Sequence, residues 1–121
     1  MKKLFIAAIM SMSLLTTSTF AEIKMGIILG FTGPIESLTP AMAASAELAF
    51  KEASDSGALL GGEKITPVRA DSTCVDSAAA TTAAEGLVSQ GVAAIMGADC
   101  SGVTGAIASN VAVPKGVVMI S

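Results

Sequence analysis

The segment of this sequence best suited to ligand chemistry is residues 97–104, GADCSGVT. It follows an apolar run, residues 92–96, that predicts a buried strand, and it opens residues 102–110, which can form a helix. A strand-to-helix turn of small residues directs free backbone N–H groups and the positive end of the helix dipole outward. With Ser101 as the expected N-cap, this turn has room for an anionic group such as a carboxylate. A plain helix cap uses the same geometry, so the residues alone leave both interpretations open.

The composition disfavours catalysis at this turn. The sequence has no His, which excludes a His-based triad, a His metal site or a His proton shuttle within these residues. Ser101 therefore lacks an activating base, and its neighbours do not form a G-x-S-x-G elbow. Residues 57–64, GALLGGEK, fail as a phosphate-binding loop, because Glu63 occupies the lysine position and a strand follows. We expect no catalytic residue, no metal and no cofactor.

Charge and length set further bounds. The 121 residues suffice for one modest domain. A formal net charge of −3 argues against a nucleic-acid or anionic-membrane partner, which would require a basic patch. Asp71 and Asp99 lie at predicted strand ends, where we expect solvated or capping carboxylates rather than ligand contacts.

The first 21 residues have the pattern of a secretory signal peptide. Lys2 and Lys3 precede a short apolar stretch, residues 4–15, and Ala21 closes a small-residue cleavage site. The mature chain would begin near Glu22 in an oxidising compartment. The alternative is an uncleaved N-terminal anchor.

Export to an oxidising compartment bears on the only two cysteines of the sequence, Cys74 and Cys100. Exported proteins tend to oxidise such pairs. Each cysteine follows a strand-like segment, and parallel strands would bring both to the same sheet edge. This predicts a disulfide, and two buried free thiols are the alternative.

Strands and helices are expected to alternate along the chain. Apolar runs predict strands over residues 23–29, 65–71, 92–96 and 117–120. Amphipathic segments predict helices over residues 39–56, 76–90 and 102–110. This order implies an α/β fold with a parallel, doubly wound sheet. Pro67 lacks a backbone donor, so the second strand should lie at a sheet edge.

Helix ends and faces also follow from the pattern. Thr39 and Asp76 are expected to cap the first two helices, and Glu47 and Lys51 to form an i,i+4 ion pair. Gly57 should follow the end of the first helix. The expected core-facing residues are Met42, Ala46, Ala49, Phe50 and Ala53 in the first helix, and Ala80, Ala83, Ala84, Leu87 and Val88 in the second.

The chain ends at Ser121, at the carboxyl end of the predicted fourth strand. Ligands of open α/β sheets bind at that edge, so the following loop should matter. We expect a fragment of a longer protein, and a very small four-stranded domain is the alternative.

Several segments in register carry a resemblance. They are residues 23–26 (IKMG), 31–34 (FTGP), 46–57, 71–74 (DSTC), 97–101 (GADCS) and 117–121 (VVMIS). Together with the predicted signal peptide, they resemble the N-terminal part of a periplasmic solute-binding protein of the leucine/isoleucine/valine-binding type. That family supplies the receptor component of ABC importers. The resemblance spans residues 23–121.

The resemblance implies the first lobe of a type I periplasmic binding protein, which closes with a second lobe on an amino acid. Ser101 would contact the ligand carboxylate, and Gly102 and Thr104 would lie beside it at the helix start. The two cysteines would form the disulfide that holds this loop. Leu38 stands where family members often have an aromatic residue lining the side-chain pocket, so branched-chain specificity does not carry over directly.

The resemblance also implies a periplasmic location and ABC permease subunits as partners. Contacts to the ligand ammonium would come mostly from the second lobe. Two alternatives stay open at this point: an extracellular sensor domain of a signalling receptor built on the same fold, and an exported α/β enzyme.

Overall fold

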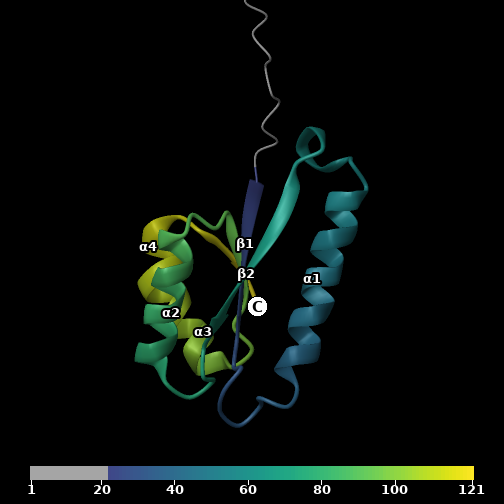
Figure 1. The fold of residues 1–121 in the computed structure, drawn as a ribbon. Coiled ribbons are helices and arrows are strands. Elements are labelled where there is room, and N and C mark those ends of the chain that lie inside the picture. The colour runs from purple at the N-terminus through teal and green to yellow at the C-terminus, as the bar shows by residue number, and fades with distance from the viewer. Residues whose placement is uncertain (1–21) are drawn as a thin grey trace, which may run out of the picture.

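Four parallel strands form the sheet that organises this chain (Figure 1). The computed structural model describes residues 22–121, and the predicted signal peptide lies outside them. The strands are β1 (Glu22–Leu29), β2 (Lys64–Asp71), β3 (Ala94–Gly97) and β4 (Val118–Ile120). Their spatial order is β2-β1-β3-β4, which confirms the predicted parallel α/β sheet. Pro67 lies on β2, an edge strand, as expected.

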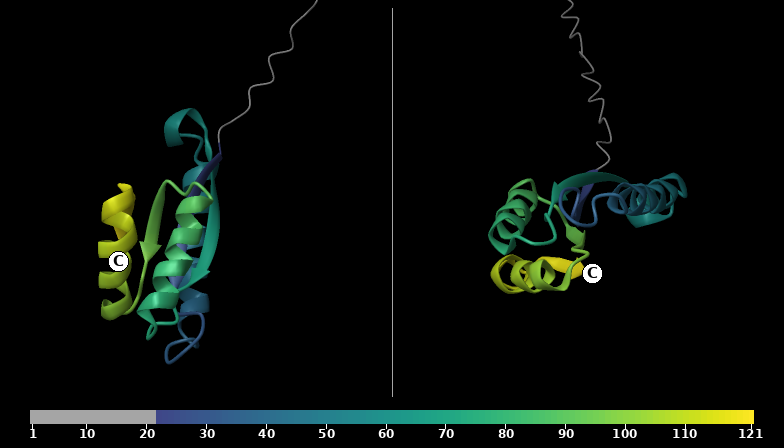
Figure 2. Two further views of the ribbon diagram at one scale, coloured as in Figure 1. Left: turned by 90° about the vertical axis from the view of Figure 1, so that its left-hand side faces the viewer. Right: turned by 90° about the horizontal axis from the view of Figure 1, so that it is seen from below.

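Helices cover both faces of the sheet (Figures 1 and 2). Helix α1 (Thr39–Asp55) lies on one face, and α2 (Ser77–Ser89) and α3 (Ser101–Ile107) lie on the other. A short 3₁₀ turn, η1 (Leu59–Gly61), precedes β2. Within residues 22–121, no helix combines the length and apolar character needed to cross a membrane.

The third helix runs further than its sequence predicts. It was expected to end at residue 110, but α3 continues through a π-helical segment, η2 (Ala108–Ala112), into α4 (Val113–Lys115). Pro114 has no backbone donor and crowds the carbonyl four residues before it. The wider π-helical turn lies directly before Pro114, so the helix continues beyond the proline. It is terminated by Gly116, where φ is 66°.

The core has one part on each face of the sheet, because successive residues of β1 point to opposite sides. Ile28 packs with buried side chains of α2 and α3. Ile27 and Leu29 pack with Ala43 of α1. The expected core face of α2 is confirmed, since all five of its residues are buried or packed against the core.

The expected core face of α1 is only partly correct. Ala46, Phe50 and Ala53 are half-buried, but Met42 and Ala49 are exposed. The fully covered positions of this helix are instead Thr39, Ala43 and Ser54. The Ser54 hydroxyl donates to Phe50 O (2.8 Å) and accepts from Ile65 N (2.9 Å), so a polar residue fastens α1 to β2.

One of the two predicted helix caps is wrong. The Asp76 carboxylate accepts hydrogen bonds from Ala78 N and Ala79 N, as expected of the α2 N-cap. The N-cap of α1 is Leu38, and Thr39 lies inside the first turn. Thr39 is fully buried, and its hydroxyl donates to Gly30 O at 3.1 Å. Since this hydroxyl binds the residue that follows β1, it does not cap the helix.

The predicted ion pair between Glu47 and Lys51 is also wrong. Lys51 pairs with Asp55, one turn further along α1. Glu47 instead accepts from Arg69 of β2 through both carboxylate oxygens, at 2.6 and 2.8 Å. A bidentate guanidinium contact is geometrically better than an ammonium contact, which explains the choice of partner. Gly57 follows the end of α1 with φ of 68°, as predicted.

Candidate ligand site

The candidate site lies at the carboxyl ends of β1 and β3. These two strands are neighbours, and the helices that follow them, α1 and α3, cover opposite faces of the sheet (Figure 1). Open α/β sheets bind ligands at this kind of topological switch point, because the two loops diverge and leave space between them. The segment predicted from the sequence, residues 97–104, is one of these loops.

The turn after β3 depends on Gly97. Its φ is 112°, and a Cβ built there would stand 1.9 Å from the carbonyl oxygen of Ile28 on β1. Only glycine allows this close approach of the two strand ends. Gly97 therefore sets the path by which the chain leaves β3 and enters α3.

Ser101 is not the N-cap that the sequence predicts. Cys100 holds the N-cap position, with an extended backbone (φ −124°, ψ 128°), and no side chain caps the helix by a hydrogen bond. Ser101 is the first helical residue and is exposed, as is Gly102. The expected cap is off by one residue, because the disulfide cysteine takes the extended conformation.

The predicted disulfide is present. Cys74 and Cys100 are joined, with 5.3 Å between their Cα atoms. The bond connects the loop after β2 to the first turn of α3. It therefore attaches the segment that carries Ser101 to a second loop of the same sheet edge.

The two strand-end acids both bind backbone donors of neighbouring loops. Asp71 accepts from the Thr32 hydroxyl (2.6 Å), from Thr32 N (3.3 Å) and from Thr73 N (2.8 Å). Burial opposes ionisation of Asp71, but the hydrogen bonds from Thr32, Thr73 and Phe31 outweigh it and hold the pKa of this carboxyl below its usual range. Asp99 accepts from Gly30 N with both oxygens, at 3.1 and 3.0 Å.

Two hydroxyl groups converge on one carbonyl beside the α3 start. Thr104 donates to Ala98 O at 3.2 Å, and Ser121 donates to the same oxygen at 2.7 Å. The two hydroxyl oxygens lie 3.5 Å apart. Ser121 was not among the predicted site residues, and its position after β4 is the only sequence signal for it. These contacts fasten the end of β4 to the turn after β3.

A depression of about 410 Å³ opens at this edge of the sheet, on the side toward α1. Its lining is mostly apolar and comprises Leu29, Met42, Met96, Gly97, Ala98, Asp99, Ile120 and Ser121. The residue pattern of the first helix predicted a core position for Met42, and Met96 was not among the predicted site residues. Leu38, the predicted pocket residue, is 61% exposed and does not line the depression.

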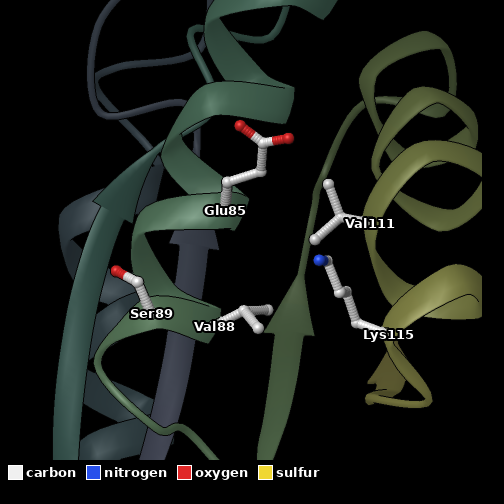
Figure 3. A pocket seen from close by; sticks show the side chains of 5 residues that line it. All are labelled: Glu85, Val88, Ser89, Val111 and Lys115. Atoms are coloured by element: carbon white, nitrogen blue, oxygen red, sulfur yellow. The ribbon is translucent and has the colours of Figure 1, made fainter.

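A second cavity lies away from the strand ends, between α2 and the η2–α4 segment (Figure 3). It measures about 230 Å³ and is lined by Glu85, Val88, Ser89, Val111 and Lys115. None of these residues belongs to the predicted site. Within residues 22–121, no group of three or more His, Cys, Asp or Glu side chains is placed to hold a metal ion.

Two of the solved structures that share this fold are described as amino-acid-binding proteins. The isoleucine complex of LivJ, a branched-chain amino acid transporter substrate-binding protein from Streptococcus pneumoniae, is 31% identical and superposes with a TM-score of 0.73 over 84% of this chain and 28% of that chain. The leucine-binding protein LivK from Thermotoga maritima is 26% identical, with a TM-score of 0.67 over 80% of this chain and 26% of that chain.

A third structure shows the fold alone. It is an extracellular ligand-binding receptor from Verminephrobacter eiseniae, 19% identical, with a TM-score of 0.73 over 84% of this chain and 28% of that chain. This chain thus spans less than a third of the length of each of these structures. A search of the curated proteins found no match.

The family profile described as periplasmic binding protein matches residues 22–121, all the residues that the structure describes. The parallel four-stranded sheet with helices on both faces matches the type I periplasmic-binding-protein fold. The chain belongs to the periplasmic binding protein family.

Proposed function

We propose that this chain is part of the first lobe of a solute-binding receptor that captures an amino acid for an ABC importer. The family match over residues 22–121 is the observation that carries the proposal. The predicted signal peptide, residues 1–21, supports a periplasmic location for the receptor. ABC permease subunits in the inner membrane would be its protein partners, and nothing in the charge balance favours a nucleic acid.

The exposed start of α3 is the proposed carboxylate site. Ser101 and Gly102 are both exposed at the first helical positions, where backbone N–H groups have no partner within the helix. A ligand carboxylate there would accept from these N–H groups and from the Ser101 hydroxyl, with the helix dipole favouring its charge. Thr104 lies one turn further, and its contact to Ala98 O keeps its hydroxyl beside the site.

The apolar depression supports a ligand with an apolar side chain. Its walls include Leu29, Met42, Met96 and Ile120, and its volume is within the range of small-molecule sites. Leu38 is exposed at the N-cap of α1, outside the lining of this depression. Isoleucine and leucine, the ligands named for the two similar proteins, are therefore the first amino acids to test.

A calorimetric titration of the full-length protein with a panel of amino acids tests this function. We expect binding of at least one apolar amino acid. Ser101→Ala should weaken it by about tenfold to a hundredfold, which is the usual cost of losing a hydrogen bond to a charged group. Ser109→Ala is the matched control, since Ser109 is exposed on η2.

Two results would contradict the proposal. Absence of heat and of thermal stabilisation with every amino acid would remove the amino-acid receptor function. Equal affinities of the Ser101→Ala and Ser109→Ala variants would remove Ser101 from the site.

A further inference from the structure

We infer that Asp99 is a positioning residue that holds the loops of the ligand site in place before the ligand arrives. The inference rests on the proposed function, since it concerns the affinity of that site. Asp99 is half-buried two residues after the end of β3 and directly before Cys100. Its carboxylate accepts from Gly30 N through both oxygens, at 3.1 and 3.0 Å, and lies 3.4 Å from the Ser72 hydroxyl, which donates to it.

These partners belong to the ends of three adjacent strands. Gly30 directly follows β1, Ser72 directly follows β2, and Asp99 follows β3. The spatial order of the strands is β2-β1-β3, so one carboxylate connects all three loop origins across the sheet edge. Ser72 is itself fully buried, and its backbone N donates to Leu29 O at 2.8 Å.

Gly30 also connects Asp99 to the first helix, α1. Its N–H donates to Asp99, and its carbonyl accepts from the buried Thr39 hydroxyl at 3.1 Å. Gly30, the first residue of the loop before α1, is therefore held both by the turn after β3 and by the first residue of α1. The disulfide joins the loops after β2 and β3, but it does not include the β1 loop. The Asp99–Gly30 contact connects the β1 loop to the turn after β3, and the Thr32–Asp71 hydrogen bonds connect it to the end of β2.

Ordering of these loops matters for affinity, because a loop that is mobile before binding must be immobilised at a cost to the binding free energy. A hydrogen bond from a backbone N–H to a carboxylate is charge-assisted and stronger than a neutral one. Loss of the Asp99 acceptor would leave Gly30 N without its partner and loosen the β1 loop. The expected consequence is weaker ligand binding without loss of any direct ligand contact.

Asp99 also lines the apolar depression, so a direct contact to a ligand ammonium is the competing role. The Asp99→Asn and Asp99→Leu variants separate the two. Asn keeps an oxygen that accepts from Gly30 N but loses the charge, whereas Leu removes both acceptors and keeps the same branching of heavy atoms. Asp55→Leu is the control for the loss of a charge, since Asp55 is exposed at the far end of α1.

We expect the Asp99→Asn variant of the full-length protein to bind its amino acid within about threefold of wild type, and Asp99→Leu to bind at least about tenfold more weakly. Asp55→Leu should bind like wild type. Equal, large losses in Asn and Leu variants would assign Asp99 to ligand charge and overturn the inference. An unchanged affinity of the Leu variant would overturn it as well.

A spectroscopic measurement does not depend on whether the Leu variant folds. The ¹H–¹⁵N resonance of Gly30 at pH 7 should shift in Asp99→Asn relative to wild-type protein, because the acceptor of its N–H changes from a carboxylate to an amide oxygen. Asp71, the neighbouring strand-end acid, binds Thr32 and Thr73, so Asp71→Asn should shift the Gly30 resonance much less. A Gly30 resonance that shifts no more in Asp99→Asn than in Asp71→Asn would overturn the inference.

The two proposals fail in distinguishable ways. If wild-type protein binds no amino acid, the proposed function fails, and the Gly30 resonance still decides whether Asp99 holds the β1 loop. If wild-type protein binds and the Asp99 variants behave otherwise than stated, only the positioning role fails.

Discussion

At the residue scale, the site depends on glycines that leave no room for a Cβ and on carboxylates that accept from backbone N–H groups. Gly97 allows the turn after β3 to pass close to Ile28, and Gly33, with φ of 94°, lies where a Cβ would be 2.4 Å from Thr73 O. Asp71 and Asp99 bind backbone N–H groups of neighbouring loops. The glycines and acids at these strand ends therefore shape the site as much as the candidate ligand contacts do.

Gly97→Ala should destabilise the protein strongly. The new Cβ would meet the Ile28 carbonyl oxygen at 1.9 Å, and φ of 112° is unfavourable for alanine. We expect a loss of more than about 2 kcal/mol in the free energy of unfolding, measured by urea denaturation. Gly105→Ala is the control, because Gly105 lies in α3 with open space around it and should gain up to about 1 kcal/mol. Equal stability of the Gly97→Ala variant and wild type would refute the steric argument.

Asp71 should make stability depend on acid. Burial raises the pKa of Asp71, but the hydrogen bonds from Thr32 and Thr73 outweigh burial. The pKa of the folded state is therefore lowered. A carboxyl with a depressed folded pKa stabilises the protein above its unfolded pKa, about 3.9, and this contribution is lost as the pH falls through the folded value. Asp71→Asn should therefore be less stable than wild type at pH 7, and the difference should shrink in acid. Urea midpoints at pH 7 and below pH 4 measure this, and a gap that widens in acid would contradict it.

At the scale of elements, the strand-end loops are joined to one another. The disulfide joins the β2 and β3 loops, and Thr104 and Ser121 join the α3 start to the end of β4 through Ala98 O. The local helix caps are correspondingly weak, since neither α1 nor α3 has a side-chain cap. Tertiary contacts replace local ones at this edge of the sheet.

Removing the disulfide should lower stability and loosen the α3 start. Cys74 and Cys100 are 26 positions apart, which in the chain-entropy model corresponds to about 3–4 kcal/mol in the free energy of unfolding. Denaturation with and without reductant measures the difference, and the Cys74→Ser/Cys100→Ser double variant should match the reduced protein. Mass spectrometry of the exported protein should show both cysteines oxidised. A stability unaffected by reductant would contradict the role of the bond.

At the scale of the whole molecule, the order of strands decides where a ligand can bind. The neighbouring strands β1 and β3 are followed by helices on opposite faces of the sheet. The depression, the start of α3 and Asp99 therefore lie at the same carboxyl edge of the sheet. The function proposed here follows from this arrangement together with the family match.

Much of the fold could be predicted from the sequence. Apolar runs, helix periodicity and glycines identified all four strands and three helices, Pro67 identified an edge strand, and Asp76 identified a cap. These signals are local, because periodicity and backbone constraints act over a few residues. The helix that passes Pro114 was missed, since it depends on a π turn that residue pattern does not reveal.

The sequence by itself thus determined the order of elements, the paired cysteines and the segment that opens α3. Only the tertiary structure decided the partners of Asp99, Thr39, Glu47 and Ser121, which lie 69, 9, 22 and 23 positions from the groups they bind. Such partners follow from strand order and register, which bring distant residues to one edge of the sheet. Local pattern carries no information on which of several donors will stand within 3 Å of a given carboxylate. The turn at residues 97–104 was therefore recognisable from its sequence, but the groups that hold it in place were not.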